Sequence, residues 1–437
     1  MIAVVQRRFW WILIAIVAVA FAIRWAYILE FRRDQASCNL IGPEQICGDA
    51  YSYHAGANLL ADGRGYIDPL LLREDIVRPG AIHPPAYVTY LGLWSMLGAR
   101  SVLWHQFASV VLGLGTVVVT ALFGRDLISE RVGLLAASAM AVYPYVWFSD
   151  GAVMSESMAL LAVACAAWAA ARFLRTPSTS AAGLVGGGTA FAMLSRSEFA
   201  LYLPLVVVVG LLGPLRSLVP RARLGRIAVA GVIFASLSAP WVVRNLTAFH
   251  HPVVITTGLG LATAYANCDT TYEEPNLGYW SYWCAQTITV GQPGNDESDE
   301  ERLFRRQALD YIDAHRSELP KVLAARFLRQ WNLYAPNNQV GLDVLIEGRE
   351  RTLSRAALMA YYAMVPFAAV GALVLRRGRN RALAPLLIVP IVVSAAALVT
   401  YANTRFRAPA ELTLVVLAAV GALHVFDRLR APRPLPH

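Results

Sequence analysis

The sequence predicts an all-α polytopic membrane protein, and three observations lead to this fold class. The 437-residue chain is 57% hydrophobic and only 15% charged, with a mean hydropathy of +0.48, whereas a soluble domain usually carries about 25% charged residues. Apolar segments of roughly 20 residues, the length that crosses a bilayer, recur along most of the chain. Basic residues gather in the short connectors between these segments, as they do in cytoplasmic loops.

The net charge of +9 follows from this topology. Much of the excess lies in short runs between apolar segments, and such runs mark the cytoplasmic side of a membrane protein. They are Arg7-Arg8, Arg216 to Arg226, Arg376 to Arg381 and Arg428 to Arg433. We therefore expect both ends of the chain on the cytoplasmic side and no nucleic-acid partner.

Charge parity along the chain gives about ten transmembrane spans. The first apolar segment lacks a small-residue cleavage site and is interpreted as a retained span rather than a signal peptide. The segment 84–97 is short and cannot cross if the parity is to close, so we expect an interfacial or re-entrant helix on the outer side. The predicted spans are 9–29, 102–123, 132–149, 157–174, 181–195, 199–215, 227–242, 356–375, 382–401 and 410–426.

The polar segments between the spans divide the chain into three predicted parts. Residues 1–242 form an N-terminal transmembrane module that includes the outer loop 30–101. Residues 243–355 form a second outer loop, large enough to be a small domain. Residues 356–437 form the last transmembrane helices and a basic cytoplasmic tail.

Four of the five cysteines lie in the predicted outer loops. Cys38 and Cys47 share the first loop, Cys268 and Cys284 share the second, and Cys165 lies within a span. Two pairs, each confined to one outer loop, predict the disulfides Cys38–Cys47 and Cys268–Cys284 in an oxidising compartment. Free thiols, pairing between the loops and metal binding are the alternatives.

Polar side chains gather at the predicted outer rim, and converging charges at a membrane boundary usually mark function. Some have a structural explanation when taken singly: Asp49 suits a helix N-terminus, and a His-Pro-Pro sequence suits a helix start. Two arginines between Tyr401 and Pro409 face outward against the positive-inside bias, which favours a phosphate ligand. The rim residues are Asp49, Glu156, His83, Arg244, Arg405 and Arg407.

These residue types together predict transfer from a phosphate-linked lipid at the membrane surface. Arginines at the level of the lipid headgroups hold a phosphate, and a carboxylate beside them acts as general base toward an acceptor hydroxyl.

The order of the motifs resembles the GT-C fold glycosyltransferases that use polyprenyl-phosphate sugars. The similar branch is the family 39-like one, with the protein O-mannosyltransferases and the lipid A aminoarabinose transferases. The resemblance extends from residue 9 to about residue 425, and it depends on the joint order of short motifs. These are Gly48-Asp49-Ala50-x-x-Tyr53, Gly63-Arg64-Gly65-Tyr66, His83-Pro84-Pro85, Ser155-Glu156, Leu194-Ser195-Arg196-Ser197-Glu198, Pro240-Trp241-x-x-Arg244-Asn245, Gly258 to Asn267 and Arg405-x-Arg407-x-Pro409.

The resemblance implies a GT-C-like helical bundle with interfacial helices in the first outer loop. It implies that Asp49 is the catalytic carboxylate of an inverting displacement. Some relatives bind a divalent cation near this carboxylate and others do not, so metal dependence stays open, with Glu156 and His83 as candidate ligands. The residues that would bind the donor phosphate or sugar are His83, Glu156, Arg244, Asn245, Arg405, Arg407, Tyr53 and Arg196.

The chain departs from this family in two ways. Asp49 is followed by Ala50, where the protein mannosyltransferases carry an acidic pair, and this argues against protein mannosylation. No large outer domain follows the last span, so we expect acceptor recognition in the loop 243–355. Its aromatic residues fit a sugar-stacking surface and an interfacial aromatic belt equally well. They are Tyr265, Tyr272, Tyr279, Trp280, Tyr282 and Trp283.

The predicted function is therefore an inverting glycosyltransferase of the bacterial inner membrane. Its active site faces the periplasm or exterior, its donor is a polyprenyl-phosphate sugar, and its acceptor is a glycan, a lipid or a protein. The alternative is a transporter or lipid flippase, which would favour charges at the bilayer midplane or an internal repeat; neither is evident in the sequence. A scaffold protein with a decayed site is a third reading, against which the intact Asp49, Arg405 and Arg407 argue.

Overall fold

The computed structural model describes residues 2–33, 39–41, 44–46 and 48–430. Within these residues the chain is an all-helical polytopic membrane protein, as the sequence predicts, apart from one short hairpin of β1 (Asn39–Ile41) and β2 (Glu44–Ile46). Six helical segments in the described part are long and apolar enough to cross a membrane. They are Arg7–Arg32, Val102–Leu127, Glu156–Arg175, Pro220–Ala248, Arg351–Arg377 and Thr404–Arg430.

A helix occupies each of the ten predicted spans, although not all of these helices are long. Ser197–Leu212 and Leu383–Val399 are apolar but shorter than the six long helices, and α8 over the predicted span 181–195 has 17 residues. The bundle elements are α1 (Ile2–Tyr27) with η1 (Ile28–Arg32), α4 (Val102–Leu127), α5 (Glu130–Val142), α6 (Pro144–Trp147), η3 (Phe148–Gly151), α7 (Glu156–Arg175), α8 (Thr179–Ser195), η4 (Ser197–Leu201), α9 (Tyr202–Leu212), η5 (Pro214–Ser217), α10 (Pro220–Ala248), α16 (Arg351–Arg377), α17 (Leu383–Val399), η7 (Thr404–Ala410) and α18 (Glu411–Arg430).

The segment expected to be one straight span over 132–149 is broken. α5 and the following α6–η3 segment meet at an angle of 70°, because Pro144 begins a new helix and Tyr143 before it is held in an extended conformation. Arg24 secures the bend from α1: its Nε donates to Asp150 at 2.8 Å, and its Nη2 donates to the Met140 carbonyl at 3.2 Å. This break turns the chain toward the end of the bundle where Glu156 begins α7.

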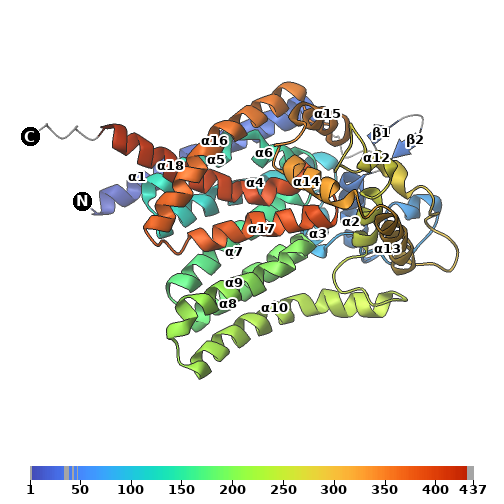
Figure 1. Ribbon diagram of the computed structural model, residues 1–437, viewed down its shortest axis with the longest axis horizontal. Helices are drawn as coiled ribbons and strands as arrows, with labels where there is room; N and C mark the ends of the chain where they lie inside the picture. The colour runs from blue at the N-terminus through green and yellow to red at the C-terminus, as the bar shows by residue number, and fades with distance from the viewer. Residues whose placement is uncertain (1, 34–38, 42–43, 47, 431–437) are drawn as a thin grey trace, which may run out of the picture.

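The two predicted outer loops lie together at one end of the bundle (Figure 1). α3 has 12 residues and packs against α2, in keeping with the prediction that 84–97 does not cross. The elements of this end are α2 (Asp49–Ala61), η2 (Leu71–Glu74), α3 (Pro85–Met96), α11 (Gly258–Tyr265), α12 (Asp269–Tyr272), η6 (Tyr282–Ala285), α13 (Glu297–Ala314), α14 (Leu319–Gln330) and α15 (Pro336–Glu347).

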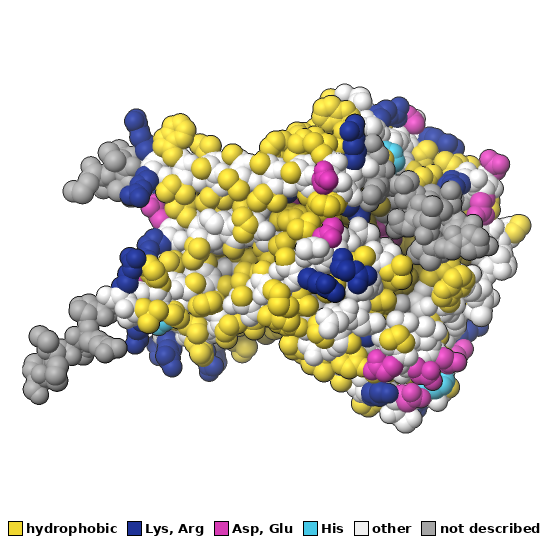
Figure 2. All heavy atoms as spheres, turned by 90° about the horizontal axis from the view of Figure 1, so that it is seen from above, with side chains coloured by type: hydrophobic (Ala, Val, Ile, Leu, Met, Phe, Trp, Pro, Cys, Tyr) yellow, Lys and Arg dark blue, Asp and Glu magenta, His cyan; other side chains and the backbone are white. Residues whose placement is uncertain are grey.

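The opposite end of the bundle is basic. α1 begins there and α18 ends there (Figure 1), and dark-blue Lys and Arg side chains gather at the same end in Figure 2. The last turns of α7, α16 and α18 supply several of these arginines. Most acidic side chains visible in Figure 2 lie at the other end, and a largely hydrophobic surface covers the helices between. The two ends of the bundle thus differ in charge, as the sequence predicts from its basic connectors.

Two glycines allow α16 and α18 to cross in close contact. A Cβ on Gly371 would overlap the Leu417 carbonyl, and a Cβ on Gly421 would overlap the Phe367 carbonyl. Small residues at helix crossings let backbones approach closely in membranes, where packing rather than hydrophobic burial drives helix association. The crossing fixes α18, and with it the short helix η7 that leads into α18.

Candidate active site

Asp49 is the first residue of α2 and follows Gly48, which is extended at the N-cap position. Its carboxylate accepts a hydrogen bond from Arg405 Nη2 at 2.9 Å and lies 3.5 Å from His83 Nε2. A carboxylate at a helix N-terminus is also favoured by the helix dipole. The Asp49 side chain is 36% exposed, so a reactant can reach it.

The charge of Asp49 is set by its neighbours. Burial by itself raises the pKa of this carboxyl, but the positive charge of Arg405 and the hydrogen bonds and proximity of Arg405 and His83 outweigh burial and hold the pKa well below its usual range. Asp49 is therefore ionised at neutral pH and, while paired with Arg405, a weak base.

Arg405 connects three carboxylates. Besides Asp49, its guanidinium lies 3.2 Å from Glu156 and 3.5 Å from Glu347. Asn403 holds this arrangement: its side chain accepts from the Arg405 backbone N–H at 2.9 Å and donates to Glu347 at 2.8 Å. One cation is thus shared by carboxylates from α2, α7 and α15.

Glu156 and Arg196 form the second half of the site. Arg196 donates to Glu156 at 2.7 Å and to Glu198 at 2.6 Å. The Phe406 ring lies 4.6 Å from the Arg196 guanidinium and 5.1 Å from that of Arg405, which fixes both planes by cation–π contact. The sequence prediction placed these residues on one side of the membrane, and the structure brings them into contact.

Two groups in this cluster have no hydrogen-bond partner among the described residues. They are the buried Nε of Arg405, a donor, and the buried Oε2 of Glu156, an acceptor. A buried donor or acceptor without a partner costs free energy, which a bound ligand recovers. A ligand with both an anionic oxygen and a hydroxyl would satisfy the two groups together.

His83 is positioned by a loop, residues 79–83, that is held from several sides. The Tyr53 ring stacks on the His83 ring with centroids 4.6 Å apart. The buried Glu297, at the start of α13, accepts from the Ala81 backbone N–H and from the Thr257 hydroxyl, both at 2.7 Å. Burial and the nearby Asp68 raise the pKa of Glu297 to about 7, against the effect of its hydrogen bonds.

Arg244 and Asn245, predicted to bind the donor, instead support the same loop. Arg244 donates to the Gly80 carbonyl at 3.0 Å and to the Tyr66 carbonyl at 2.6 Å. Asn245 donates to the Ile255 carbonyl at 3.1 Å. The structure shows no contact of either side chain with Asp49 or Arg405 among the described residues. Arg244 contacts loop 79–83 through Gly80, and Asn245 accepts from Arg244 at 2.9 Å.

Arg407 also lies apart from the cluster. Its Nε donates to Glu411 at 2.7 Å, both side chains are almost completely buried, and the Tyr361 ring lies 4.1 Å from the guanidinium. The pairing with Glu411 satisfies the charge inside the bundle, where an unpaired arginine would be costly. Arg405 and Arg407 therefore do not meet at one site.

Glu347 was not among the predicted residues. It ends α15, just before Gly348, whose left-handed backbone terminates the helix. Nearby, Asp343 accepts from Arg349 at 3.0 Å and from Thr404 at 2.6 Å, which ties α15 to the start of η7. No local motif marks Glu347; the only sequence signal is that outward-facing Arg405 needs acidic partners.

The second-loop disulfide prediction is confirmed, because Cys268 and Cys284 are bonded. The other predicted pair, Cys38–Cys47, lies outside the described residues. Cys165 is a free thiol within α7.

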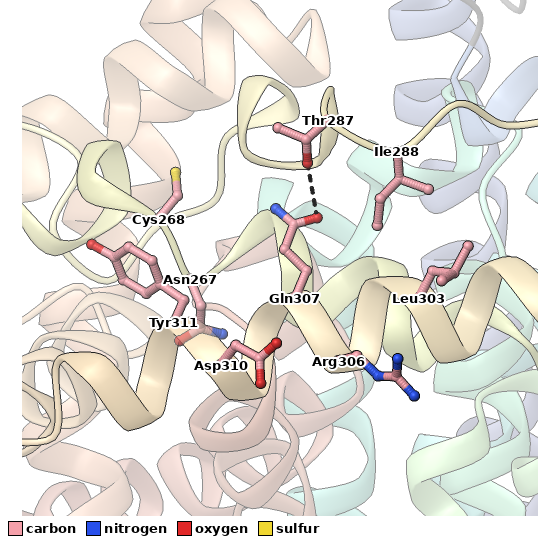
Figure 3. A pocket seen from close by; sticks show the side chains of 9 residues that line it. All are labelled: Asn267, Cys268, Thr287, Ile288, Leu303, Arg306, Gln307, Asp310 and Tyr311. Carbon is pink, nitrogen blue, oxygen red and sulfur yellow. Dashed lines mark hydrogen bonds between the residues drawn. The ribbon is translucent and has the colours of Figure 1, made fainter.

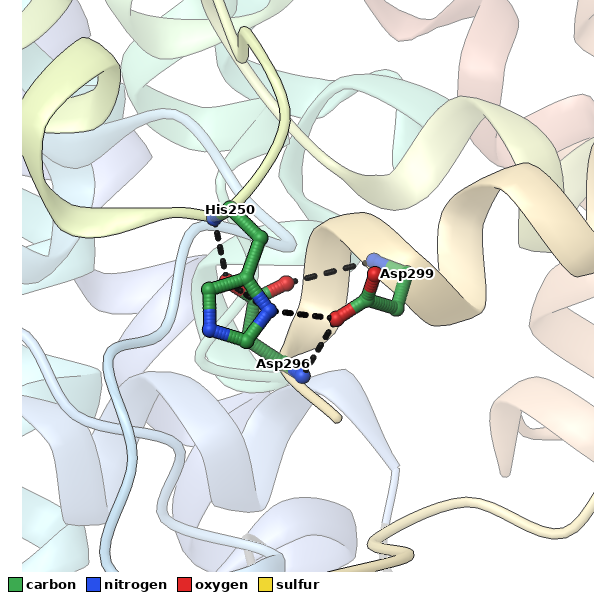
Figure 4. Close-up of side chains that lie close together, drawn as sticks. All are labelled: His250, Asp296 and Asp299. Carbon is green, nitrogen blue, oxygen red and sulfur yellow. Dashed lines mark hydrogen bonds and ion pairs between the residues drawn. The ribbon is translucent and has the colours of Figure 1, made fainter. Parts of the chain in front are cut away.

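The predicted metal ligands do not form a metal-binding group. Glu156 is engaged by the guanidinium groups of Arg196 and Arg405, which repel a cation, and only Asp49 faces His83. In the described part of the chain, the histidine and carboxylate atoms come close enough for a cation at His250, Asp296 and Asp299 (Figure 4). Those residues suit a divalent cation by type.

Helix capping already accounts for the carboxylates of that second group. Asp296 is the N-cap of α13 and accepts from the backbone N–H groups of Ser298 and Asp299, while Asp299 accepts from the Asp296 N–H. Asp296 also accepts from the His250 backbone N–H at 2.6 Å. The cluster fastens the end of α10 to α13.

A surface groove lies elsewhere on the outer end. It has a volume of about 490 Å³ and shares no residue with the Asp49 cluster (Figure 3). Gln307 crosses it, hydrogen-bonded to Thr287 at 3.2 Å, and Cys268 of the disulfide lies at its rim. We assign the chemistry to the Asp49 cluster, because the groove holds no converging ionised groups around a reactive carboxylate.

Fold and site together define a polytopic membrane protein with a cluster of carboxylates and arginines around Asp49 and Arg405 at the end opposite its basic face. Solved structures with the same fold include the archaeal oligosaccharyltransferase AglB from Archaeoglobus fulgidus in complex with an inhibitory peptide and a dolichol-phosphate. That match has a TM-score of 0.58 at 12% identity, over 99% of this chain and 53% of the other. The Archaeoglobus fulgidus oligosaccharyltransferase tethered with an acceptor peptide containing the NVT sequon matches with a TM-score of 0.59 at 14% identity, over 96% and 50%.

A third structure, the same oligosaccharyltransferase in complex with zinc and sulfate, has a TM-score of 0.56 at 13% identity, over 96% of this chain and 49% of the other. The chain thus spans about half the length of the oligosaccharyltransferase that it matches. No family model and no curated protein sequence matches the chain. The structural matches confirm the predicted GT-C fold.

Proposed function

We propose that the protein is an inverting glycosyltransferase that moves a sugar from a polyprenyl-phosphate donor to an acceptor hydroxyl on the outer face of the membrane. Its place is cell-envelope glycan, glycolipid or glycoprotein synthesis in a bacterial inner membrane. The observation that carries the proposal is the ion pair of Asp49 with Arg405, with His83 beside it, at the end of the bundle opposite the basic end.

In the proposed reaction, the acceptor oxygen attacks the anomeric carbon of the donor sugar. The new bond from that oxygen to the anomeric carbon forms as the bond from the carbon to the phosphate oxygen breaks, and polyprenyl phosphate leaves. Asp49 takes the acceptor proton. Arg405, whose Nε is ion-paired with Glu156 at 3.2 Å but makes no hydrogen bond among the described residues, holds the phosphate and stabilises the charge that develops on it.

Donor binding also makes Asp49 a stronger base. The donor phosphate competes with Asp49 for Arg405, and a shared guanidinium favours the ionised carboxylate less. The pKa of Asp49 then rises toward the range in which a carboxylate is an effective general base. The site is thereby a poor base until the donor is in place.

The surrounding residues take positioning roles. Glu156, with its unpartnered Oε2, accepts a hydroxyl of the donor sugar, and Arg196 fixes the orientation of Glu156. Tyr53 and His83 form a stacked pair beside Asp49. No step requires a metal, since the residues of this site do not fit one.

The structural relatives support a lipid-phosphate donor only by analogy. The AglB complex contains a dolichol-phosphate and an inhibitory peptide, and the related complexes contain an acceptor peptide or zinc and sulfate. This chain spans half of that enzyme, so we propose the donor class and leave the acceptor to experiment. Recognition of the acceptor is proposed for residues 243–355.

The test is to supply the purified protein in lipid nanodiscs with a panel of polyprenyl-phosphate sugars and extracted envelope acceptors. Release of polyprenyl phosphate, measured by mass spectrometry, is the expected result with at least one donor. A transporter or flippase would move labelled donor between leaflets of proteoliposomes and release none. Lipid movement without release would overturn the proposal.

A further inference from the structure

An aromatic row leads from the outer loop domain to the Asp49 cluster. Tyr265, at the end of α11, lies 5.7 Å from Trp280, and Trp280 lies 5.8 Å from Tyr401. Tyr401 in turn lies 5.0 Å from Phe406, the ring that contacts Arg196 and Arg405. The second outer loop and the segment 401–406, which are distant in sequence, thus place their rings in one continuous row.

The row reaches the carboxylate cluster through Phe406. The Phe406 ring lies 5.0 Å from the Tyr401 ring and 5.1 Å from the guanidinium of Arg405, which donates to Asp49 at 2.9 Å. The row is therefore a wall of the site itself and not a distant patch. A group bound against it lies beside the carboxylate that takes the acceptor proton.

Trp280 carries an open hydrogen-bond donor in this wall. Its indole Nε1 is buried and makes no hydrogen bond of normal geometry to the described residues; the polar group beside it is the buried hydroxyl of Tyr279, whose ring stacks on Trp280 and which is itself without a hydrogen-bond partner. Buried tryptophan N–H groups usually find a partner, so an open one beside a reaction centre indicates a ligand oxygen. An aromatic face combined with an N–H donor suits a sugar ring, which offers C–H groups on its face and hydroxyls on its edge.

Tyr272 and Trp283, two other aromatic residues of the second outer loop, lie outside the aromatic row. The Tyr272 hydroxyl donates to Asn267 at 2.8 Å and its ring packs against Tyr311, so its polar atom is satisfied. Trp283, three residues after Trp280, is 65% exposed. The predicted aromatic cluster thus divides into a wall at the site and rings with structural or surface positions.

We propose that Tyr265, Trp280 and Tyr401 form a saccharide-binding wall that stacks a pyranose ring of the substrate, with the Trp280 indole N–H donating to one of its hydroxyls. The inference rests on the proposed glycosyl transfer and specifies its substrate chemistry. The ring belongs either to the donor sugar or to a glycan acceptor. Donor hydrolysis measured without acceptor distinguishes the two.

The wall is held in place by the confirmed disulfide. The Cys268–Cys284 bond closes the loop that contains Trp280. The backbone N–H of Ala402 donates to the Gly278 carbonyl at 3.2 Å, which fastens this loop to the segment of Tyr401. Restricting the loop reduces the entropy lost when a sugar orders the wall.

The test compares Trp280→Ala and Trp280→Phe with Trp283→Ala, a tryptophan in the same disulfide-closed loop but outside the wall. Stacking is lost in W280A, and we expect kcat/KM for transfer to fall about tenfold or more, with a smaller loss in W280F, which keeps the ring. W283A stays at the wild-type value. Equal values for W280A and wild type, or equal losses in W280A and W283A, would overturn the wall.

Hydrolysis of the donor in the absence of acceptor identifies the bound ring. If W280A raises the KM for acceptor and leaves donor hydrolysis unchanged, the wall holds a glycan acceptor. If donor hydrolysis falls in parallel with transfer, the wall holds the donor sugar. Both results support a saccharide wall. A W280A variant that loses transfer only to a non-saccharide acceptor, with donor hydrolysis and transfer to glycan acceptors unchanged, contradicts it.

A binding measurement separates this inference from the reaction. Saturation-transfer difference NMR with a panel of pyranose disaccharides should show contacts to the wild type and W283A and lose them in W280A. Binding with no glycosyl transfer from any donor would overturn the proposed function while keeping the wall. Transfer with identical disaccharide signals in wild type and W280A would overturn the wall while keeping the function.

Discussion

Two carboxylates at the outer end of this protein, Asp49 and Glu297, stand in contrasting environments. Asp49 pairs with Arg405 and faces His83, and its pKa lies well below the usual range. Glu297 is buried with two neutral donors, the Ala81 N–H and the Thr257 hydroxyl, and its pKa is raised to about 7. At Glu297 the two neutral donors and the charge of Arg78 do not offset desolvation and the nearby Asp68, whereas at Asp49 the directly bonded guanidinium of Arg405, with His83 beside it, outweighs desolvation.

This difference in environment suits a reactive role for Asp49 and a structural role for Glu297. The charge of Asp49 depends on the cation of Arg405, and in the proposed reaction the donor phosphate competes for that cation, so we expect the basicity of Asp49 to respond to donor binding. The charge of Glu297 depends on burial, which a substrate does not change, so its effect is on the stability of loop 79–83. Both act on His83, one by contact and the other through the loop that carries it.

The largest expected effect comes from making the same amide change at both positions. Asp49→Asn removes the group that accepts the acceptor proton, and we expect transfer to fall by about 10²- to 10⁴-fold. Glu297→Gln keeps a side-chain oxygen that accepts from both the Ala81 N–H and the Thr257 hydroxyl, so we expect most activity to remain. Polyprenyl phosphate release by both variants in nanodiscs measures this, with thermal unfolding as the control for folding. Equal losses of transfer activity in the two variants would contradict the separate roles of Asp49 and Glu297.

The second effect separates Arg405 from Arg407. Arg405→Gln removes a charge-assisted bond to the donor phosphate, and we expect donor affinity to fall about 10- to 100-fold. It also removes the cation that favours ionised Asp49, so the acidic limb of the kcat/KM profile should move to higher pH.

Arg407→Gln is the matched change two residues away. It leaves Glu411 buried without its cation and should destabilise the fold by about 3–5 kcal/mol. Native mass spectrometry of donor binding and thermal unfolding distinguish these outcomes. A stable Arg407→Gln protein with weakened donor binding would return Arg407 to the site, as the sequence predicts.

The comparison also explains how far the sequence alone could lead. Charge parity placed Asp49, His83, Glu156 and Arg405 on one side, because basic connectors fix the direction of each span. Those residues meet in the structure. The same reasoning placed Arg407 with them, since parity fixes the side of the membrane but not the direction of a side chain.

Backbone geometry decides that direction. η7 is a 3-10 helix, in which successive residues are about 120° apart, so residues two apart face different sides. Arg405 meets the carboxylates and Arg407 meets Glu411 inside the bundle. A sequence motif of the form Arg-x-Arg suggests one paired site only if the segment is extended, and that information is absent from the motif.

Long-range partners were equally hidden. Glu347 and Glu297 belong to the second outer loop, and their contacts with Arg405 and Ala81 join segments far apart in the chain. The 70° bend before Phe148 depends on an extended Tyr143 and on Arg24 from the first span. Composition and periodicity identified the helices, whereas these contacts arise only from how the helices pack.

The smallest expected effect is the pH dependence that Glu297 adds to stability. Its pKa of about 7 in the folded protein lies above the ordinary 4.5, so between these values the folded state holds a proton that the unfolded chain has released. Stability therefore falls as pH rises from about 4.5 to about 7, by an amount of about 3 kcal/mol at most. Glu297→Gln removes this dependence.

The measurement is the difference in unfolding temperature between pH 5 and pH 8 in nanodiscs, compared for wild type and Glu297→Gln. We expect the variant to gain stability relative to wild type at pH 8 and to lose that advantage at pH 5. Thr257→Val is the control that removes one hydrogen bond of the carboxylate, and it should raise the pKa of Glu297 further and steepen the fall. An unchanged pH dependence in Glu297→Gln would mean that the charge of Glu297 is already offset, and the contrast with Asp49 would then rest on geometry alone.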